Sequence, residues 1–147
     1  MKQCCRYMVL ICCLTLCSCA QIDSYVEKAK MAKLNEDCEK SIKDYNKLLR
    51  WREIETAGML YMDREQRDEF LKNAEGIKKR GVTITDYRIL TTECLAEKKT
   101  ADVVVEFDYY TLPSNRIKTL TYRQDWKYVD ADEKKGWLLK TVIPEFE

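Results

Sequence analysis

Three carboxylates in the second half of the chain, Asp86, Glu106 and Asp108, are the side chains best suited to acid–base chemistry. The tyrosines available to them are Tyr61, Tyr87, Tyr109 and Tyr110. A carboxylate beside a tyrosine can move a proton, but the chain contains no histidine, the commonest general base. Alternation along a strand lets Glu106 and Asp108 face either solvent or a pocket. We therefore assign no catalytic residue, and a small hydrolase, isomerase or dehydratase is the alternative to a binding function.

Acidic residues also gather at Asp130, Asp132 and Glu133, in the run DADEKKG (130–136). A calcium loop needs a longer run of acids, a glycine in mid-loop and a closing glutamate. The run is instead typical of a solvated turn. The four glycines of the chain are isolated from one another, so they do not form a phosphate-binding loop. We predict no metal site and no cofactor.

The charge balance bears on the class of partner. The chain has 26 basic and 25 acidic residues, for a net charge of +1. Proteins that bind nucleic acid usually present a basic stripe that neutralises phosphates, so we predict no nucleic-acid partner. The longest basic run, residues 78–80, fits the last turn of a helix, where cations suit the helix dipole.

The first nineteen residues, MKQCCRYMVLICCLTLCSC, place two basic residues before an apolar run at 8–16. This run has the length of a signal-peptide core and about half of the roughly 20 apolar residues that span a bilayer. It ends in Leu16-Cys17-Ser18-Cys19, which resembles the bacterial lipobox, although Cys17 stands where Ala, Ser or Thr is more usual. The alternative is an ordinary secretory signal, but no A-x-A-like cleavage site lies near Ala20.

The lipobox resemblance implies cleavage after Ser18 and a lipid anchor on Cys19. It divides the chain into a signal peptide (1–18), a lipidated N-terminus with a tether (19–34) and one domain (35–147). Ala20, rather than Asp, follows the cysteine, which by the sorting rules of diderm bacteria favours the periplasmic face of the outer membrane. The implied protein is an envelope lipoprotein, with the membrane as one partner and an envelope protein as a candidate second partner.

Loss of the signal and lipidation of Cys19 would leave Cys38 and Cys94 as the thiols of the mature domain. Two thiols in an oxidising compartment suggest one disulfide, which would stabilise the fold by roughly 4 kcal/mol. The alternative is two separate buried thiols that act as small apolar side chains.

Two helices are expected first. Between residues 35 and 56, Cys38, Ile42, Tyr45 and Leu49 recur on one helical face, which Leu48 and Trp51 widen. A second helix should begin at Asp63, which with Gln66 is close to a capping box. Its buried stripe would be Phe70, Ala74 and Ile77, and Gly81 would end it.

Beyond Gly81 the apolar period changes to two. Strands are expected at 82–90, 101–112, 116–129 and 137–143. The strongest alternating face is Ala101, Val103, Val105, Phe107 and Tyr109. Short turns between strands predict an antiparallel meander, and helices followed by strands predict an α+β fold in which two N-terminal helices pack on a four-stranded sheet.

The last hairpin has a predicted register. A seven-residue turn, Asp130 to Gly136, would place Val129 opposite Trp137 and Trp126 opposite about Lys140. Trp137 would then pack near Tyr128 or Val129. We predict that Trp137 is a core residue rather than a surface binding residue.

Residues 35–143 resemble the nuclear transport factor two-like superfamily. The resemblance rests on Leu48-Leu49-Arg50-Trp51, Arg67, Phe70-Leu71, Trp126, Tyr128 and Gly136-Trp137-Leu138-Leu139. It implies a cone-shaped α+β fold, which hosts enzymes, binding proteins and structural modules. The candidate pocket residues are Tyr61, Tyr87, Tyr109 and Trp126, although most aromatic side chains of such a sheet pack in its core. We predict a non-catalytic binding or scaffolding domain for a protein partner or a small ligand.

Overall fold

A computed structural model describes residues 2–131 and 134–146, with backbone alone for residues 2–23. The chain divides into two compact units, Met1–Leu34 and Asn35–Glu147. The first unit is helical throughout its described part and belongs to α1 (Lys2–Arg50). Within the part of the chain that the structure describes, no helix is both long enough and apolar enough to cross a membrane.

In the second unit, α1 contributes one buried stripe. Cys38, Ile42, Tyr45 and Leu49 are all buried, as their spacing predicts. The helix ends at Arg50 rather than near residue 56, so Trp51 lies beyond the helix and is 63% exposed. The prediction that Trp51 widens the buried face is therefore wrong.

Two shorter helices follow, α2 (Ile54–Tyr61) and α3 (Arg67–Lys79). The helix α2 was not predicted, and α3 begins four residues after the predicted start at Asp63. The predicted capping box is wrong, because Gln66 makes no side-chain cap and the Asp63 carboxylate accepts a hydrogen bond from Lys140 instead. The stripe of Phe70, Ala74 and Ile77 is buried as predicted.

Gly81 ends α3 as predicted. Its φ of 65° is in the left-handed region, and its N–H donates to the carbonyl of Lys78 at 3.1 Å. Glycine adopts this conformation without a steric penalty and so lets the chain turn directly into the sheet.

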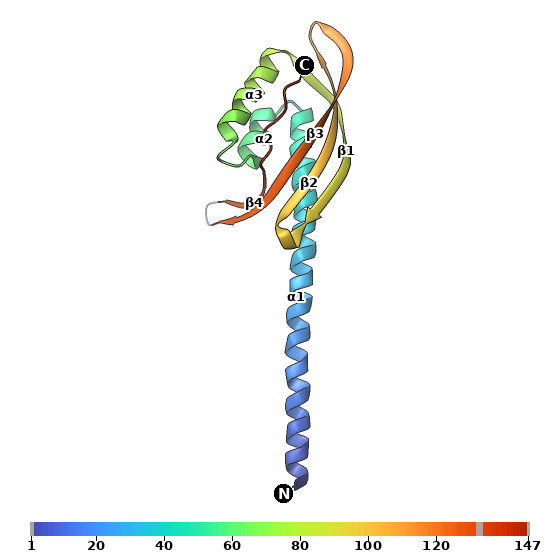
Figure 1. Cartoon of the computed structure of the whole chain (residues 1–147), viewed down its shortest axis with the longest axis vertical. Coiled ribbons are helices and arrows are strands. Elements are labelled where there is room, and N and C mark those ends of the chain that lie inside the picture. The colour runs from blue at the N-terminus through green and yellow to red at the C-terminus, as the bar shows by residue number, and fades with distance from the viewer. Residues whose placement is uncertain (1, 132–133, 147) are drawn as a thin grey trace. The chain divides into compact units, whose positions relative to one another are not determined.

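The sheet has four antiparallel strands in sequence order, as predicted (Figure 1). The strands are β1 (Val82–Leu95), β2 (Thr100–Thr111), β3 (Ser114–Ala131) and β4 (Lys134–Leu139), with a short 3₁₀ turn, η1 (Ala96–Lys98), after β1. The fold is thus α+β, with helices followed by an open antiparallel sheet. Three helices precede the sheet rather than two.

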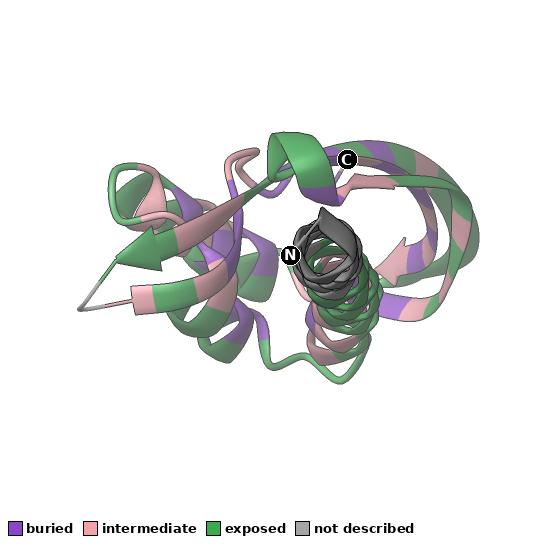
Figure 2. Ribbon diagram, turned by 90° about the horizontal axis from the view of Figure 1, so that it is seen from below, coloured by how far each residue is buried: buried purple, intermediate pink, exposed green. Residues whose placement is uncertain are grey.

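One face of the sheet forms the core. Buried and more exposed residues alternate along the long strands (Figure 2), and all five residues of the predicted β2 face are buried. Residues after β4 complete this core, because Ile143 and Phe146 are each 1% exposed. The predicted fourth strand, 137–143, is therefore misplaced: pairing ends at Leu139, and the following segment packs through side chains instead.

The β3–β4 register differs from the prediction by one residue. Trp137 pairs with Tyr128, and Trp126 pairs with Leu139. The predicted turn was too long, since β3 continues to Ala131 and β4 resumes at Lys134. The predicted neighbour and the core assignment are confirmed: the rings of Tyr128 and Trp137 lie 5.6 Å apart, and Trp137 is 3% exposed.

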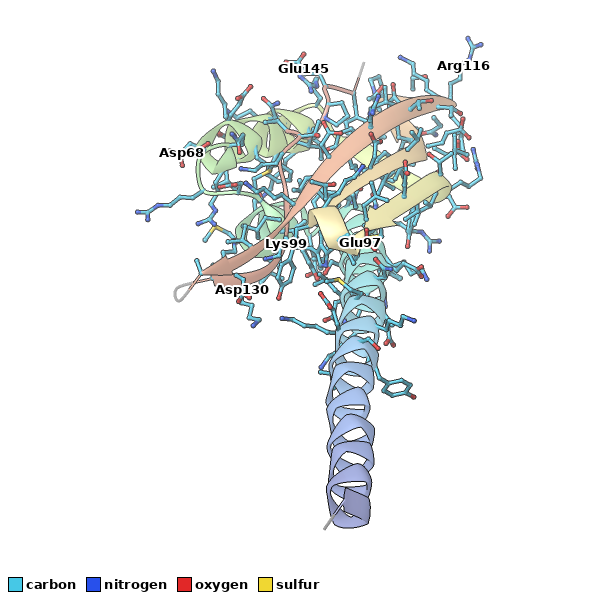
Figure 3. All side chains as sticks on the ribbon, turned by 60° about the horizontal axis from the view of Figure 1, so that its bottom comes forward. Asp68, Glu97, Lys99, Arg116, Asp130 and Glu145 are labelled. Carbon is cyan, nitrogen blue, oxygen red and sulfur yellow. A yellow bond between two sulfur atoms is a disulfide. The ribbon has the colours of Figure 1, made fainter. Side chains whose placement is uncertain are left out.

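A disulfide joins Cys38 of α1 to Cys94 of β1, with 6.4 Å between the two Cα atoms (Figure 3). Of the alternatives that the sequence leaves open, the structure contains the bridge. It fastens the helix covalently to the end of β1 nearest to η1.

Candidate functional site

The four aromatic residues predicted to line a pocket separate into two clusters. Tyr61 and Trp126 lie together, with ring centroids 6.0 Å apart, and both rings pack edge-on against Tyr45 of α1. Trp126 is 2% exposed. This cluster joins α1, α2 and β3, and its rings fill space between those elements.

Tyr87 and Tyr109 belong to the second cluster, around Phe107. The Tyr87 ring lies 6.5 Å from the Phe107 ring, and Tyr109 meets Phe146 edge-on at 4.9 Å. Phe146 thus occupies the space that Tyr109 faces. The structure does not bring the four predicted residues into one cavity.

The carboxylates considered for proton transfer lie on the opposite face of the sheet, where charged side chains pair with one another. Arg88 binds Glu106 at 2.6 Å and Asp108 at 2.7 Å, and Thr119 donates to Asp108 at 2.9 Å. The hydrogen bond from Arg88 holds the pKa of Asp108 below its usual value. Asp108 is therefore arranged to stay charged, which suits an ion-pair network better than a proton shuttle.

A cavity of about 320 Å³ lies where α2, the end of α3 and the start of β1 meet. Its lining residues are Arg52, Ile54, Glu55, Ala74, Ile77, Lys78, Gly81 and Val82. Four of these residues (54, 74, 77 and 82) are buried apolar side chains. We call this cavity the Arg52 cleft, and its volume suits a small ligand.

Charged side chains surround the apolar part of the Arg52 cleft. Lys78 pairs with Glu55 at 3.4 Å, so these two charges largely balance. The guanidinium of Arg52 donates to the hydroxyl of Thr83, which carries no charge. Among the described residues, Arg52 has no carboxylate within ion-pair distance. The cleft therefore combines an apolar wall with one uncompensated positive charge.

The backbone positions Arg52 in an uncommon way. Its φ is 64°, in the left-handed region that non-glycine residues seldom adopt. The preceding Arg50 donates to the carbonyl of Thr85 at 3.0 Å, and its guanidinium lies 5.8 Å from the Trp51 ring. The connection between α1 and α2 is thus held against β1 through Arg50 and through the bond from Arg52 to Thr83.

A second hollow, of about 430 Å³, lies near the turn between β1 and β2. Charged residues of the sheet line much of it, and Trp126 contributes one wall. Of the two cavities described, only this one is lined by a predicted pocket residue, Trp126. Its carboxylates, Glu93, Asp102 and Asp125, make it less suited than the Arg52 cleft to an anionic ligand.

Sequence reasoning missed the Arg52 cleft. The prediction that Lys78 lies in the last turn of a helix is confirmed, but no pattern in the sequence indicates that this turn lines the same cleft as Arg52. The side chain of Cys19 lies outside the described residues. Among the residues searched, no group of His, Cys, Asp or Glu side chains has the arrangement of a metal site.

No protein-family model matches this chain, and no curated protein matches it with statistical significance.

Proposed function

We propose that this protein is a lipid-anchored protein of the bacterial cell envelope whose α+β domain binds a small amphipathic anion in the Arg52 cleft. The lipobox resemblance of residues 16–19 supports the anchor. The resemblance to the cone-shaped nuclear transport factor two-like fold supports the fold class, which hosts binding proteins as well as enzymes. The observation that carries the ligand class is the apolar cleft wall beside the charge of Arg52. The anchor would hold the domain at the periplasmic face of the outer membrane.

The chemistry of the cleft selects the ligand. An alkyl chain that enters the cleft beside Ile54, Ile77 and Val82 removes its own apolar surface from water, which is worth about 25 cal/mol per Å². A carboxylate at the cleft mouth can form a charge-assisted pair with the Arg52 fork. A neutral ligand would leave Arg52 uncompensated, so the cleft favours a fatty acid-like anion over the corresponding alcohol.

Octanoate and octanol are the probes that test the ligand class, with binding measured calorimetrically on the full chain in a non-ionic detergent. We expect octanoate to bind and octanol to bind at least about tenfold more weakly. Arg52→Gln should weaken octanoate binding by about tenfold or more, because the amide keeps a donor for Thr83 and removes the charge. Equal binding of the two probes would reject the assignment.

A matched control for Arg52→Gln is Lys79→Met. Lys79 pairs with Glu75 at 2.8 Å and does not line the cleft. Its replacement should leave octanoate affinity unchanged, whereas a similar loss in both variants would indicate a general charge effect.

The lipid anchor has its own test. Cys19→Ser should abolish metabolic incorporation of a tagged fatty acid, because only a thiol forms the thioether. Equal labelling of variant and parent would contradict the anchor. Membrane separation that finds the protein only in the inner membrane would contradict the proposed location.

A further inference from the structure

Two cationic side chains converge on one uncharged oxygen at the junction of α2, α3 and β4. Arg67 Nη2 donates to the carbonyl of Met62 at 3.4 Å, and Lys134 Nζ donates to the same carbonyl at 3.3 Å. A carbonyl dipole offers far less stabilisation to two full charges than an anion would. The arrangement therefore brings two like charges together at one carbonyl oxygen.

The carboxylate of Asp63 lies close enough to favour the charged form of Lys134, but it is paired with another lysine. Asp63 accepts a hydrogen bond from Lys140, so its charge is already matched. Among the described residues, neither Arg67 nor Lys134 has a carboxylate within 4.0 Å. The Nε of Arg67 is also buried, with no hydrogen-bond partner in the described part of the chain. A buried guanidinium N–H without an acceptor is costly.

We propose that Arg67 and Lys134 form a binding site for an oxyanion, a carboxylate or phosphate group, that sits beside the Met62 carbonyl and accepts hydrogen bonds from both side chains. The terminal nitrogens of the Arg67 guanidinium and the ammonium of Lys134 can each donate to an oxygen of one such group. The site does not depend on the lipid anchor or on the Arg52 cleft, and it shares no residue with that cleft.

Rigid elements hold the two cations in place. Arg67 is the first residue of α3, and Lys134 is the first residue of β4. Between them, Met62 forms a parallel bridge with Leu139, and the N–H of Asp63 donates to the Leu139 carbonyl at 3.0 Å. The cations therefore do not need to be ordered on binding, which lowers the entropic cost.

The electrostatics of Lys134 agree with this site. Burial, and then the charge of Arg67, lower the pKa of Lys134 below its usual value, and the charge of Asp63 offsets only part of this shift. Burial and the charge of Arg67 both disfavour the ammonium form of Lys134. An oxyanion between the two groups would relieve the repulsion and favour the charged form.

Inorganic phosphate and acetate are suitable probes, compared at constant ionic strength with chloride as the background ion. The full chain in non-ionic detergent would be titrated while the backbone amide resonances of Asp63 and Arg67 are followed by NMR. We expect saturable shifts with at least one of the two probes. The tighter probe identifies whether the natural group is a phosphate or a carboxylate. Failure of both probes to shift these resonances overturns the proposal.

Lys134→Met is the decisive variant. It should raise the Kd of the tighter probe about tenfold or more, because one charge-assisted hydrogen bond is lost. Lys135→Met is the matched control, since Lys135 pairs with Asp130 at 3.0 Å and is exposed. The control should bind as the parent does. Equal weakening in both variants, or parental affinity in Lys134→Met, would overturn the site. If Lys134→Met proves less stable than the parent in a thermal melt, the Kd of the tighter probe is measured for Arg67→Gln instead, and it should also rise.

Discussion

At the scale of single residues, a pair of buried amides connects α1 to the sheet. Asn46 and Gln124 are both fully buried. Gln124 Nε2 donates to Asn46 Oδ1 at 2.8 Å, and Asn46 Nδ2 donates to Gln124 Oε1 at 3.3 Å. Trp126 Nε1 also donates to Gln124 Oε1 at 3.3 Å. Asn46 Nδ2 also donates to the carbonyl of Ile42 at 2.8 Å. The two amides therefore belong to one buried hydrogen-bond network and stabilise the fold as a unit.

Replacing one member of this pair should cost more than its own hydrogen bond. In Asn46→Leu, the buried Nε2 of Gln124 loses its acceptor, while Oε1 keeps the bond from Trp126. The unsatisfied N–H group should lower the free energy of unfolding by about 1–3 kcal/mol. The double variant Asn46→Leu/Gln124→Met removes both polar groups and should be less destabilised than the sum of the two single variants. Urea unfolding of all four proteins measures this coupling. Strictly additive losses would show that the amides act independently.

Asp63 should make stability depend on pH in the acidic range. The hydrogen bond from Lys140 holds the pKa of this carboxyl below its usual value of 3.8. The pKa of Asp63 is lower in the folded protein than in the unfolded chain. The stabilisation by the Asp63 carboxylate is therefore present above about pH 3.8 and is lost as the pH falls through the pKa of the folded state. The stability difference between the parent and Asp63→Asn should therefore shrink below pH 4.

Chemical unfolding at a series of pH values checks this expectation. Glu36→Gln, at an exposed position of α1, is the control, and its difference from the parent should change less over the same range. A difference between the parent and Asp63→Asn that stays constant down to pH 2.5 would contradict the assigned role of Lys140.

At the scale of elements, one glycine sets the distance between α2 and α3. A Cβ built on Gly58 would lie 2.5 Å from the ring of Phe70. Phe70 is fully buried, so its ring has little room to move. Gly58→Ala should therefore destabilise the domain by about 1–3 kcal/mol through overpacking.

Gly76 offers the matched control within α3. A Cβ there meets only the end of the Arg80 side chain, at 3.7 Å, which is an ordinary contact. Gly76→Ala should stabilise the helix by roughly 0.5–1 kcal/mol, because alanine loses less backbone entropy. Thermal melts of both variants separate the two effects. A Gly58→Ala protein as stable as the Gly76→Ala protein would show that the helices separate freely.

Periodicity was sufficient to predict most of the architecture. The buried stripes of α1 and α3 and the inner face of β2 are as predicted, because a single face against the core imposes a period that is visible in the sequence. The helix α2 escaped notice since it is short and its apolar residues, such as Met59 and Leu60, do not form one clear stripe. These two side chains are instead more than half exposed.

The candidate sites could not be predicted, because they depend on distances between elements. Arg52 approaches Lys78 only because α1 ends at Arg50 and α3 ends beside β1. Lys134 meets Arg67 only through the pairing of Met62 with Leu139. A single sequence carries no signal for either approach. The hairpin register was missed for a related reason: the length of a turn cannot be read from the polarity of its residues.

At the scale of the whole molecule, the Cys38–Cys94 bridge closes a loop with a sequence separation of 56. A loop of this size should stabilise the domain by roughly 4 kcal/mol, mainly by restricting the unfolded chain. The single variant Cys38→Ser and the double variant Cys38→Ser/Cys94→Ser should each have a free energy of unfolding lower than that of the parent by roughly this amount. Urea unfolding with and without reductant measures the contribution of the disulfide. An unfolding midpoint of the parent that is the same with and without reductant would contradict the expected contribution.

The same bridge also determines how the domain would respond to mechanical tension. A pull applied to α1 on the amino-terminal side of Cys38 and to the carboxyl-terminal end passes through the sulfur–sulfur bond directly to Cys94. The intervening segment would carry no load even after every strand had separated. In a force-extension experiment, reduction should therefore release about 200 Å of extra contour length, because an extended residue spans up to about 3.6 Å.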